Sequence, residues 1–251
     1  MARWRGVLLD VGGVLRVGAR VVPGAAEVLE ELRRRGVPFA LLSNTSSTNR
    51  RLLAAELREL GLGVNAPELL TATTATAAHL RRLGGTSLFL VRPQVREDLE
   101  GLPEDERSPD HVVVGDSEQA FTREGMNRAF AALRAGADLI AMARNRWFAT
   151  PQGPAVDIGA VVAGLEYAAQ VQATLVGKPA AAFFAQGVAL LGLRPEEVVV
   201  VGDDPEADVQ GAQDAGLGAV LVGEARGRQH PDAIVPSIAG LPALLGGADG
   251  G

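Results

Sequence analysis

The chain has 251 residues, 47% of them apolar and 22% charged, which is typical of a folded globular protein. Its net charge of -6 excludes a dedicated nucleic-acid or anionic-membrane binder, because no basic field is available to displace counterions. The chain lacks cysteine and any run of about 20 apolar residues, so disulfides, thiolate sites and membrane spans are excluded and a cytoplasmic protein is expected.

Strands and helices alternate from the start of the chain. An apolar run over residues 6–10 predicts a buried strand that ends at Asp10 and a Gly12-Gly13 turn. Apolar residues at helical spacing, followed by glycine, predict helices at 25–35 and 50–60. A strand is expected between them at 37–42, and another strand or a loop near 69–70.

The same alternation continues to the C-terminus. Residues 73–172 are predicted to form a complete small α/β unit. Its expected elements are a helix through 79–80, strands at 87–91 and 111–114, a helix at 123–135 and a strand at 138–143. Beyond it we expect a strand from 174, helix 180–191, strand 198–201, helix 207–215 and strand 219–222. This order predicts an α/β fold with a doubly wound parallel sheet.

Chemically distinctive residues follow several of these strands: Asp10, Ser43-Asn44, Lys178 and Asp203-Asp204. Because ligands bind at the carboxyl ends of parallel strands, one sheet would bring these residues into one crevice. They provide a carboxylate nucleophile, groups that hold a phosphoryl oxygen, a cation and acids for Mg2+, which are the parts that phosphoryl transfer needs. Lys178 is the only lysine among 24 basic residues, which indicates a chemical reason for it.

These blocks resemble the haloacid dehalogenase (HAD) superfamily of phosphatases. The matching segments are 10–15, 42–44, 177–179 and 202–204, followed by Asp208. The long insert is similar to that of the NagD-like subfamily, and residues 156–159 and 176–184 look most like phospholysine phosphohistidine inorganic pyrophosphate phosphatases. The resemblance implies a HAD Rossmann-like core domain over 1–73 and 173–251, an α/β cap domain over 74–172, and a homodimer formed through the cap.

The resemblance also implies roles for the strand-end residues. Asp10 would form an aspartyl-phosphate and, with Asp203, would ligate Mg2+, a hard cation that takes oxygen ligands. Ser43 would hydrogen-bond the phosphoryl group, and Lys178 would hold that group and Asp10 in place. A longer, planar arginine does not replace a compact ammonium in a small site.

Further candidates complete the expected site. Asp204 and Asp208 are expected to serve the metal directly or through hydrogen bonds, and their roles are not separable from sequence. Asn44, Gly12 and Gly13 are expected to bind substrate. Arg144 and Asn145 follow a predicted strand and are candidates for contacting the leaving group, although an ordinary surface loop explains them equally well. Asp157 is a weaker candidate.

Gly12 departs from the family pattern, which has a second aspartate two residues after the nucleophile. The Gly12 carbonyl still offers Mg2+ an oxygen, but general acid-base help worth about 10²- to 10⁴-fold is lost. Alkoxide leaving groups depend most on protonation by such an acid. We therefore expect a preference for leaving groups that depart easily, such as pyrophosphate, a phosphoramidate or an aryl phosphate.

The expected function is hydrolysis of a small phosphorylated compound, with no nucleic-acid or membrane partner. Two alternatives stay open. A metal-independent dehalogenase would use Asp10 on carbon, although the Asp203-Asp204 pair and the large cap argue against it. A catalytically weak protein that binds a phosphate ligand is the other, motivated by Gly12. The three histidines show no metal-ligand spacing and are expected to be surface or half-buried residues: His79, His111 and His230.

Overall fold

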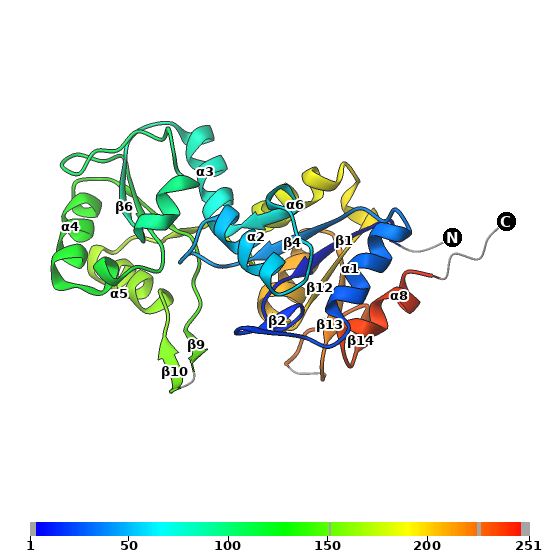
Figure 1. Cartoon of the computed structure of the whole chain (residues 1–251). Helices are drawn as coiled ribbons and strands as arrows, with labels where there is room; N and C mark the ends of the chain where they lie inside the picture. Colours follow the sequence, from blue (N-terminus) through cyan, green and yellow to red (C-terminus); the bar gives the residue numbers. More distant parts are fainter. Residues whose placement is uncertain (1–3, 151, 225–226, 247–251) are drawn as a thin grey trace. The chain divides into compact units, whose positions relative to one another are not determined.

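The computed structural model describes residues 4–150, 152–224 and 227–246, and the chain divides into two compact units (Figure 1). The core unit comprises Met1–Ser43, Arg51–Leu70 and Lys178–Gly251, and the insert unit comprises Asn44–Arg50 and Thr71–Gly177. Within the described ranges, every helix falls short of the length and apolarity that a bilayer crossing needs. The α/β class expected from the sequence is confirmed.

A six-stranded sheet forms the centre of the core unit, in the order β14-β13-β12-β1-β4-β5. Its registered pairs are all parallel. Strands β1 and β12 are buried along their whole length, as expected for strands covered on both faces. The strands are β1 (Gly6–Asp10), β4 (Phe39–Ser43), β5 (Leu69–Thr71), β12 (Val198–Gly202), β13 (Gly218–Val222) and β14 (Ala233–Val235).

Helices cover both faces of this sheet. Leu29, Leu53 and Leu241 come from three helices and pack with Val7 and Leu41 in one apolar cluster. On the opposite face, Gly187 lets a helix approach Leu8 of β1 closely. The core helices are α1 (Ala25–Arg34), α2 (Arg50–Glu59), α6 (Ala181–Leu191), α7 (Gly211–Asp214) and α8 (Leu241–Leu244).

The strand order reverses at β1, and this reversal positions the site. The chain leaves β1 toward β4 and β5 on one side, and later returns to place β12, β13 and β14 on the other. Ligands of open parallel sheets bind at such a switch point, beyond the carboxyl ends of the strands. Asp10 is the last residue of β1 and Asp203 directly follows β12, so both acids lie at this edge.

The insert unit contains its own parallel sheet, in the order β11-β8-β7-β6. Its apolar cluster includes Leu88, Val112 and Leu139 from the strands and Leu133 and Val162 from two helices. The elements are α3 (Ala72–Leu83), β6 (Ser87–Leu90), β7 (His111–Val114), α4 (Arg123–Arg134), β8 (Asp138–Ala141), α5 (Gly159–Ala169) and β11 (Thr174–Leu175).

Two small hairpins, as well as β14 and α8, were not predicted, and one predicted helix begins at a different residue. Strands β2 (Arg16–Val17) and β3 (Arg20–Val21) pair antiparallel in the core unit. In the insert unit, β9 (Trp147–Thr150) pairs antiparallel with β10 (Gly153–Val156), where a loop was expected. The helix expected over 207–215 begins earlier, as a π-helical segment (Pro205–Gln210) that leads into α7.

The fold predicts a contrast between two leucine substitutions in the core unit. Leu41 lies fully buried in β4, so Leu41→Ala should lower the free energy of unfolding by about 2–5 kcal/mol through lost burial and a cavity. Leu190 in α6 is 52% exposed, and Leu190→Ala should change stability by less than about 0.5 kcal/mol. Urea denaturation measures both, and equal effects would contradict the burial of Leu41.

Candidate active site

Lys178 is the centre of a buried charged cluster in the core unit. Its Nζ donates to Asp10 Oδ1 at 2.5 Å and to Asp208 Oδ1 at 2.6 Å. All three side chains are almost completely buried. Lys178 precedes α6, Asp10 ends β1 and Asp208 lies in the π-helical segment after β12, so three separate parts of the chain meet at one ammonium.

A third carboxylate belongs to this cluster. One carboxylate oxygen from each of Asp10, Asp203 and Asp208 lies within 4.8 Å of the others. The cluster therefore holds three carboxylates and one ammonium, which contacts two of them, and the group carries excess negative charge. Close-packed oxygen ligands with uncompensated negative charge suit a hard divalent cation such as Mg2+, so the donor set fits the expected metal.

The charges in this cluster perturb one another. Burial is the main cause that raises the pKa of Asp10 to about 7. Lys178 lowers this pKa, but the carboxylates of Asp208 and Asp203 raise it and so oppose Lys178. Burial and the nearby Asp208 carboxylate raise the pKa of Asp203 to about 6. Burial acts to lower the pKa of Lys178, but Asp10 and Asp208 outweigh burial and keep that pKa above its usual value. Lys178 is therefore a fixed cation that holds the Asp10 side chain in place.

Two of the three glycines near this cluster make room for its side chains. Gly13 has a φ of 74°, and a Cβ atom on it would overlap the Asp203 carboxylate. A Cβ on Gly202 would overlap Asp208 in the same way. Gly12 differs, because in the described part of the chain a Cβ on it would meet only Asp10 Oδ2, at 3.8 Å. The carboxylates thus need Gly13 and Gly202, while position 12 has space for a side chain.

The structure distinguishes the positions of Asp204 and Asp208, whose roles the sequence did not separate. Asp204 Oδ1 accepts hydrogen bonds from the backbone N–H groups of Glu206 and Ala207, so Asp204 caps the π-helical segment. Asp208 instead joins Asp10 at Lys178, and its Oδ2 accepts from the Asp204 N–H at 3.2 Å. This placement favours Asp208 over Asp204 as part of the cation-binding group.

The remaining candidates are divided between the two units. Ser43 is the buried last residue of β4 in the core unit. Asn44 belongs to the insert unit, where its amide occupies the space that a Cβ on Gly177 would fill. Arg144 and Asn145 also belong to the insert unit. Arg144 forms an ion pair with Glu166 at 2.5 Å, and the Asn145 carbonyl accepts from the Gly159 N–H at 3.0 Å.

Sequence reasoning overlooked a polar group at the carboxyl ends of β6 and β7 in the insert unit. Arg92 pairs with Asp116 at 3.2 Å, and the Asp116 N–H donates to Ser46 Oγ at 2.9 Å. The position of Arg92 and Asp116 just beyond apolar strands was the available signal, and it is the signal that identified Asp10. The expectation for His111 was wrong, because this side chain is buried at the start of β7.

Known families and proteins resemble this chain over most of its length. A haloacid dehalogenase-like hydrolase family model matches residues 7–102, and a second HAD hydrolase-like model matches residues 175–241. Haloacid dehalogenase-like hydrolase domain-containing protein 2 of Homo sapiens is 36% identical, covering 87% of this chain and 83% of that protein. Phospholysine phosphohistidine inorganic pyrophosphate phosphatase of Rattus norvegicus is 31% identical, covering 92% of each chain.

Solved structures show the same fold. The 4-nitrophenylphosphatase of Thermotoga maritima superimposes with a TM-score of 0.89 at 27% identity, covering 96% of this chain and 97% of that chain. NagD of E. coli K-12 superimposes with a TM-score of 0.87 at 29% identity, covering 95% and 98%. The similarity therefore extends over both units of the chain.

The site predicts that two adjacent glycines respond differently to alanine. Gly13→Ala should lower the free energy of unfolding by more than about 1 kcal/mol, because its positive φ disfavours a side chain and the Cβ displaces Asp203. Gly12→Ala places a methyl group in open space and is the matched control, with little expected loss. Urea denaturation of both variants is the measurement, and equal stabilities would contradict the packing of Asp203 against Gly13.

Proposed function

The chain belongs to the haloacid dehalogenase-like hydrolase family and is an enzyme of the phosphatase type, and we propose that it hydrolyses a small phosphorylated compound through an aspartyl-phosphate on Asp10. The observation that carries this proposal is the buried Lys178 contact of 2.5 Å to Asp10, at the switch point of the sheet. A nucleophilic carboxylate needs a fixed orientation, and this contact provides it.

The reaction has two steps in this proposal. An Asp10 carboxylate oxygen attacks phosphorus, the bond to the leaving group breaks, and the phosphoryl group is carried on Asp10. Water then attacks the acyl phosphate, which releases inorganic phosphate and restores the carboxylate. Lys178 holds Asp10 Oδ1 during both steps, which leaves Oδ2 for the attack.

The neighbouring residues have positioning and charge-balancing roles. Asp10, Asp203 and Asp208, together with the Gly12 carbonyl, would hold Mg2+. The cation would neutralise negative charge that develops on the phosphoryl oxygens. Ser43 would donate to a phosphoryl oxygen from the end of β4, assisted by Asn44 and by the backbone at Gly13. Asp204 would support this arrangement as the cap of the segment that carries Asp208.

The insert unit is the proposed cap domain, which would cover the substrate and exclude water. Asn145 and Arg144, which is held by an ion pair with Glu166, are its proposed leaving-group contacts. A homodimer formed through the cap and a cytoplasmic location both stay predictions.

Asp10→Asn should abolish phosphate release, because the amide is a poor nucleophile and cannot form the acyl phosphate. The assay follows phosphate release from p-nitrophenyl phosphate and pyrophosphate, with Mg2+ and after its removal by EDTA. The matched control is Asp214→Asn at an exposed position, which should keep full activity. We expect turnover to need the metal.

Other outcomes separate the alternatives. Turnover that persists in Asp10→Asn would remove this residue as the nucleophile. Halide release from a haloacid without metal would indicate a dehalogenase. Ligand binding without any turnover would indicate a protein that senses a phosphate compound.

Gly12→Asp should raise turnover of alkyl phosphates more than turnover of aryl phosphates. The structure has space at position 12, and the new carboxyl can protonate an alkoxide leaving group, an effect typically worth about 10²- to 10⁴-fold. Nitrophenolate departs without that proton and gains little. The ratio of kcat/KM for the two substrates is the readout, with Gly12→Asn as an isosteric control. An equal gain for both substrates would refute the missing-acid argument.

A further inference from the structure

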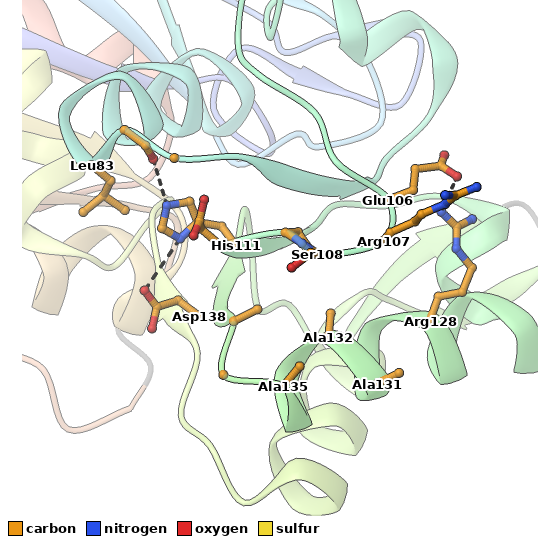
Figure 2. Close-up of a pocket in the computed structure, with 16 residues that line it drawn as sticks. Leu83, Glu106, Arg107, Ser108, His111, Arg128, Ala131, Ala132, Ala135 and Asp138 are labelled. Atoms are coloured by element: carbon orange, nitrogen blue, oxygen red, sulfur yellow. Dashed lines mark hydrogen bonds and ion pairs between the residues drawn. The ribbon is translucent and has the colours of Figure 1, made fainter.

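A cavity of about 690 Å³ lies in the insert unit, at the sheet edge where β6, β7 and β8 begin (Figure 2). The loops that precede these strands form one side of it, and the C-terminal half of α4 forms the other. Its volume is in the range of small-molecule sites. As the structure describes it, the cavity includes none of the residues proposed above for phosphoryl transfer.

His111 is the reason to regard this cavity as a binding site. The side chain is 7% exposed, and its Nε2 lies 2.9 Å from the Gly84 carbonyl. A carbonyl only accepts, so Nε2 carries the hydrogen and Nδ1 of the neutral ring is an acceptor. Among the described residues, Nδ1 is buried without a hydrogen-bond partner. Buried polar atoms are normally satisfied, so the atom indicates a missing donor.

A second acceptor lies beside this nitrogen. Asp138 Oδ2 is 3.6 Å from His111 Nδ1, too far for a hydrogen bond, and Asp138 also lines the cavity (Figure 2). Asp110 lines the same region, but its Oδ2 already accepts from the N–H and hydroxyl of Thr86. This end of the cavity therefore offers two neighbouring acceptors and negative charge. An ammonium, with three N–H donors and a positive charge, matches both.

The opposite end of the cavity has the opposite charge. Arg128 Nη2 lies 3.2 Å from Glu106 Oε2, and Arg107 follows Glu106 in the chain and lines the same cavity (Figure 2). The lining at this end thus has two guanidinium groups and one carboxylate, so its net charge is positive and suits an anion. Guanidinium groups bind carboxylates through paired N–H donors.

The length of the cavity follows from α4. Arg128 and Ala135 are seven residues apart, which corresponds to about 10 Å of helix, and Asp138 begins β8 just beyond. Ala131, Ala132 and Ala135 form an apolar floor between the charged ends (Figure 2). An extended peptide spans about 3.3–3.6 Å per residue, so three residues cover the same distance.

We propose that this cavity binds a short peptide-like zwitterion of about three residues, with its ammonium at His111 and Asp138 and its carboxylate at Arg107 and Arg128. The site is separate from the proposed phosphatase chemistry, and the binding needs no turnover. The ammonium donates a hydrogen bond to His111 Nδ1, and the carboxylate balances the positive charge at Arg107 and Arg128.

Isothermal titration calorimetry of the full chain tests the proposal with three probes: trialanine, N-acetyl-trialanine and trialanine amide. Trialanine should bind saturably with a stoichiometry of one. Removing either terminal charge should weaken binding at least about tenfold, the usual effect of losing a charge-assisted hydrogen bond.

Two variants assign the ends. Asp138 is exposed at the start of β8, so Asp138→Asn should fold normally, and it should abolish the difference between trialanine and its acetylated form. The variant should still distinguish trialanine from the amide. Arg107→Gln should abolish the difference between trialanine and its amide, and it should still distinguish trialanine from the acetylated form. Glu118→Gln and Arg20→Gln are exposed controls outside the cavity and should bind all three probes as the unmodified chain does.

Each of three results would overturn the proposal. The first is no saturable heat from trialanine up to about 10 mM. The second is equal affinity for the three probes, which would mean that the terminal charges are not recognised. The third is that Asp138→Asn and Arg107→Gln weaken all probes alike, which would show that neither side chain reads a particular terminus.

Discussion

The buried ammonium of Lys178, shared by Asp10 and Asp208, is the constraint on which the core unit depends. A charge removed from water is tolerated only when it is closely paired, so β1, the segment before α6 and the segment after β12 must converge on one point. The local backbone follows from this convergence. Gly202 and Gly13 are required where the Asp208 and Asp203 carboxylates pack against the chain, and Asp204 fixes the start of the π-helical segment that carries Asp208.

The parallel sheet makes this convergence possible without long loops. Because strand order reverses at β1, the ends of β1 and β12 are neighbours in space although nearly 200 residues separate them in the chain. Strand pairing thus supplies Asp10 and Asp203, and only Lys178 and Asp208 must be added from connecting segments. The insert unit uses the same architecture differently. There, the starts of the strands, at His111 and Asp138, line a cavity, while Arg92 and Asp116 follow the opposite ends.

Most strands and helices could be predicted from sequence because their apolar periodicity is local. The exceptions depend on partners distant in space or on side-chain detail. Strand β10 contains Pro154, which argues against a strand, and its pairing with β9 is not encoded in either segment alone. Asp10 and Lys178 were identifiable as candidates from strand ends and composition. Whether Asp204 or Asp208 joins Asp10 depends on a helix cap, and the burial of His111 depends on packing around β7, so neither was readable from spacing.

The charge balance of the cluster also gives a reason for the glycine at position 12. The cluster already holds three carboxylates and one ammonium, and a Cβ on Gly12 would lie 3.8 Å from Asp10 Oδ2. A fourth carboxylate there would add repulsion next to the proposed nucleophile, in a site where burial already opposes ionisation of Asp10. Glycine at position 12 favours ionisation of Asp10, at the expense of proton transfer to the leaving group in the proposed reaction. Easier ionisation of Asp10 and the absence of an acid at position 12 both favour substrates with good leaving groups. Such substrates need an ionised carboxylate more than they need a proton donor.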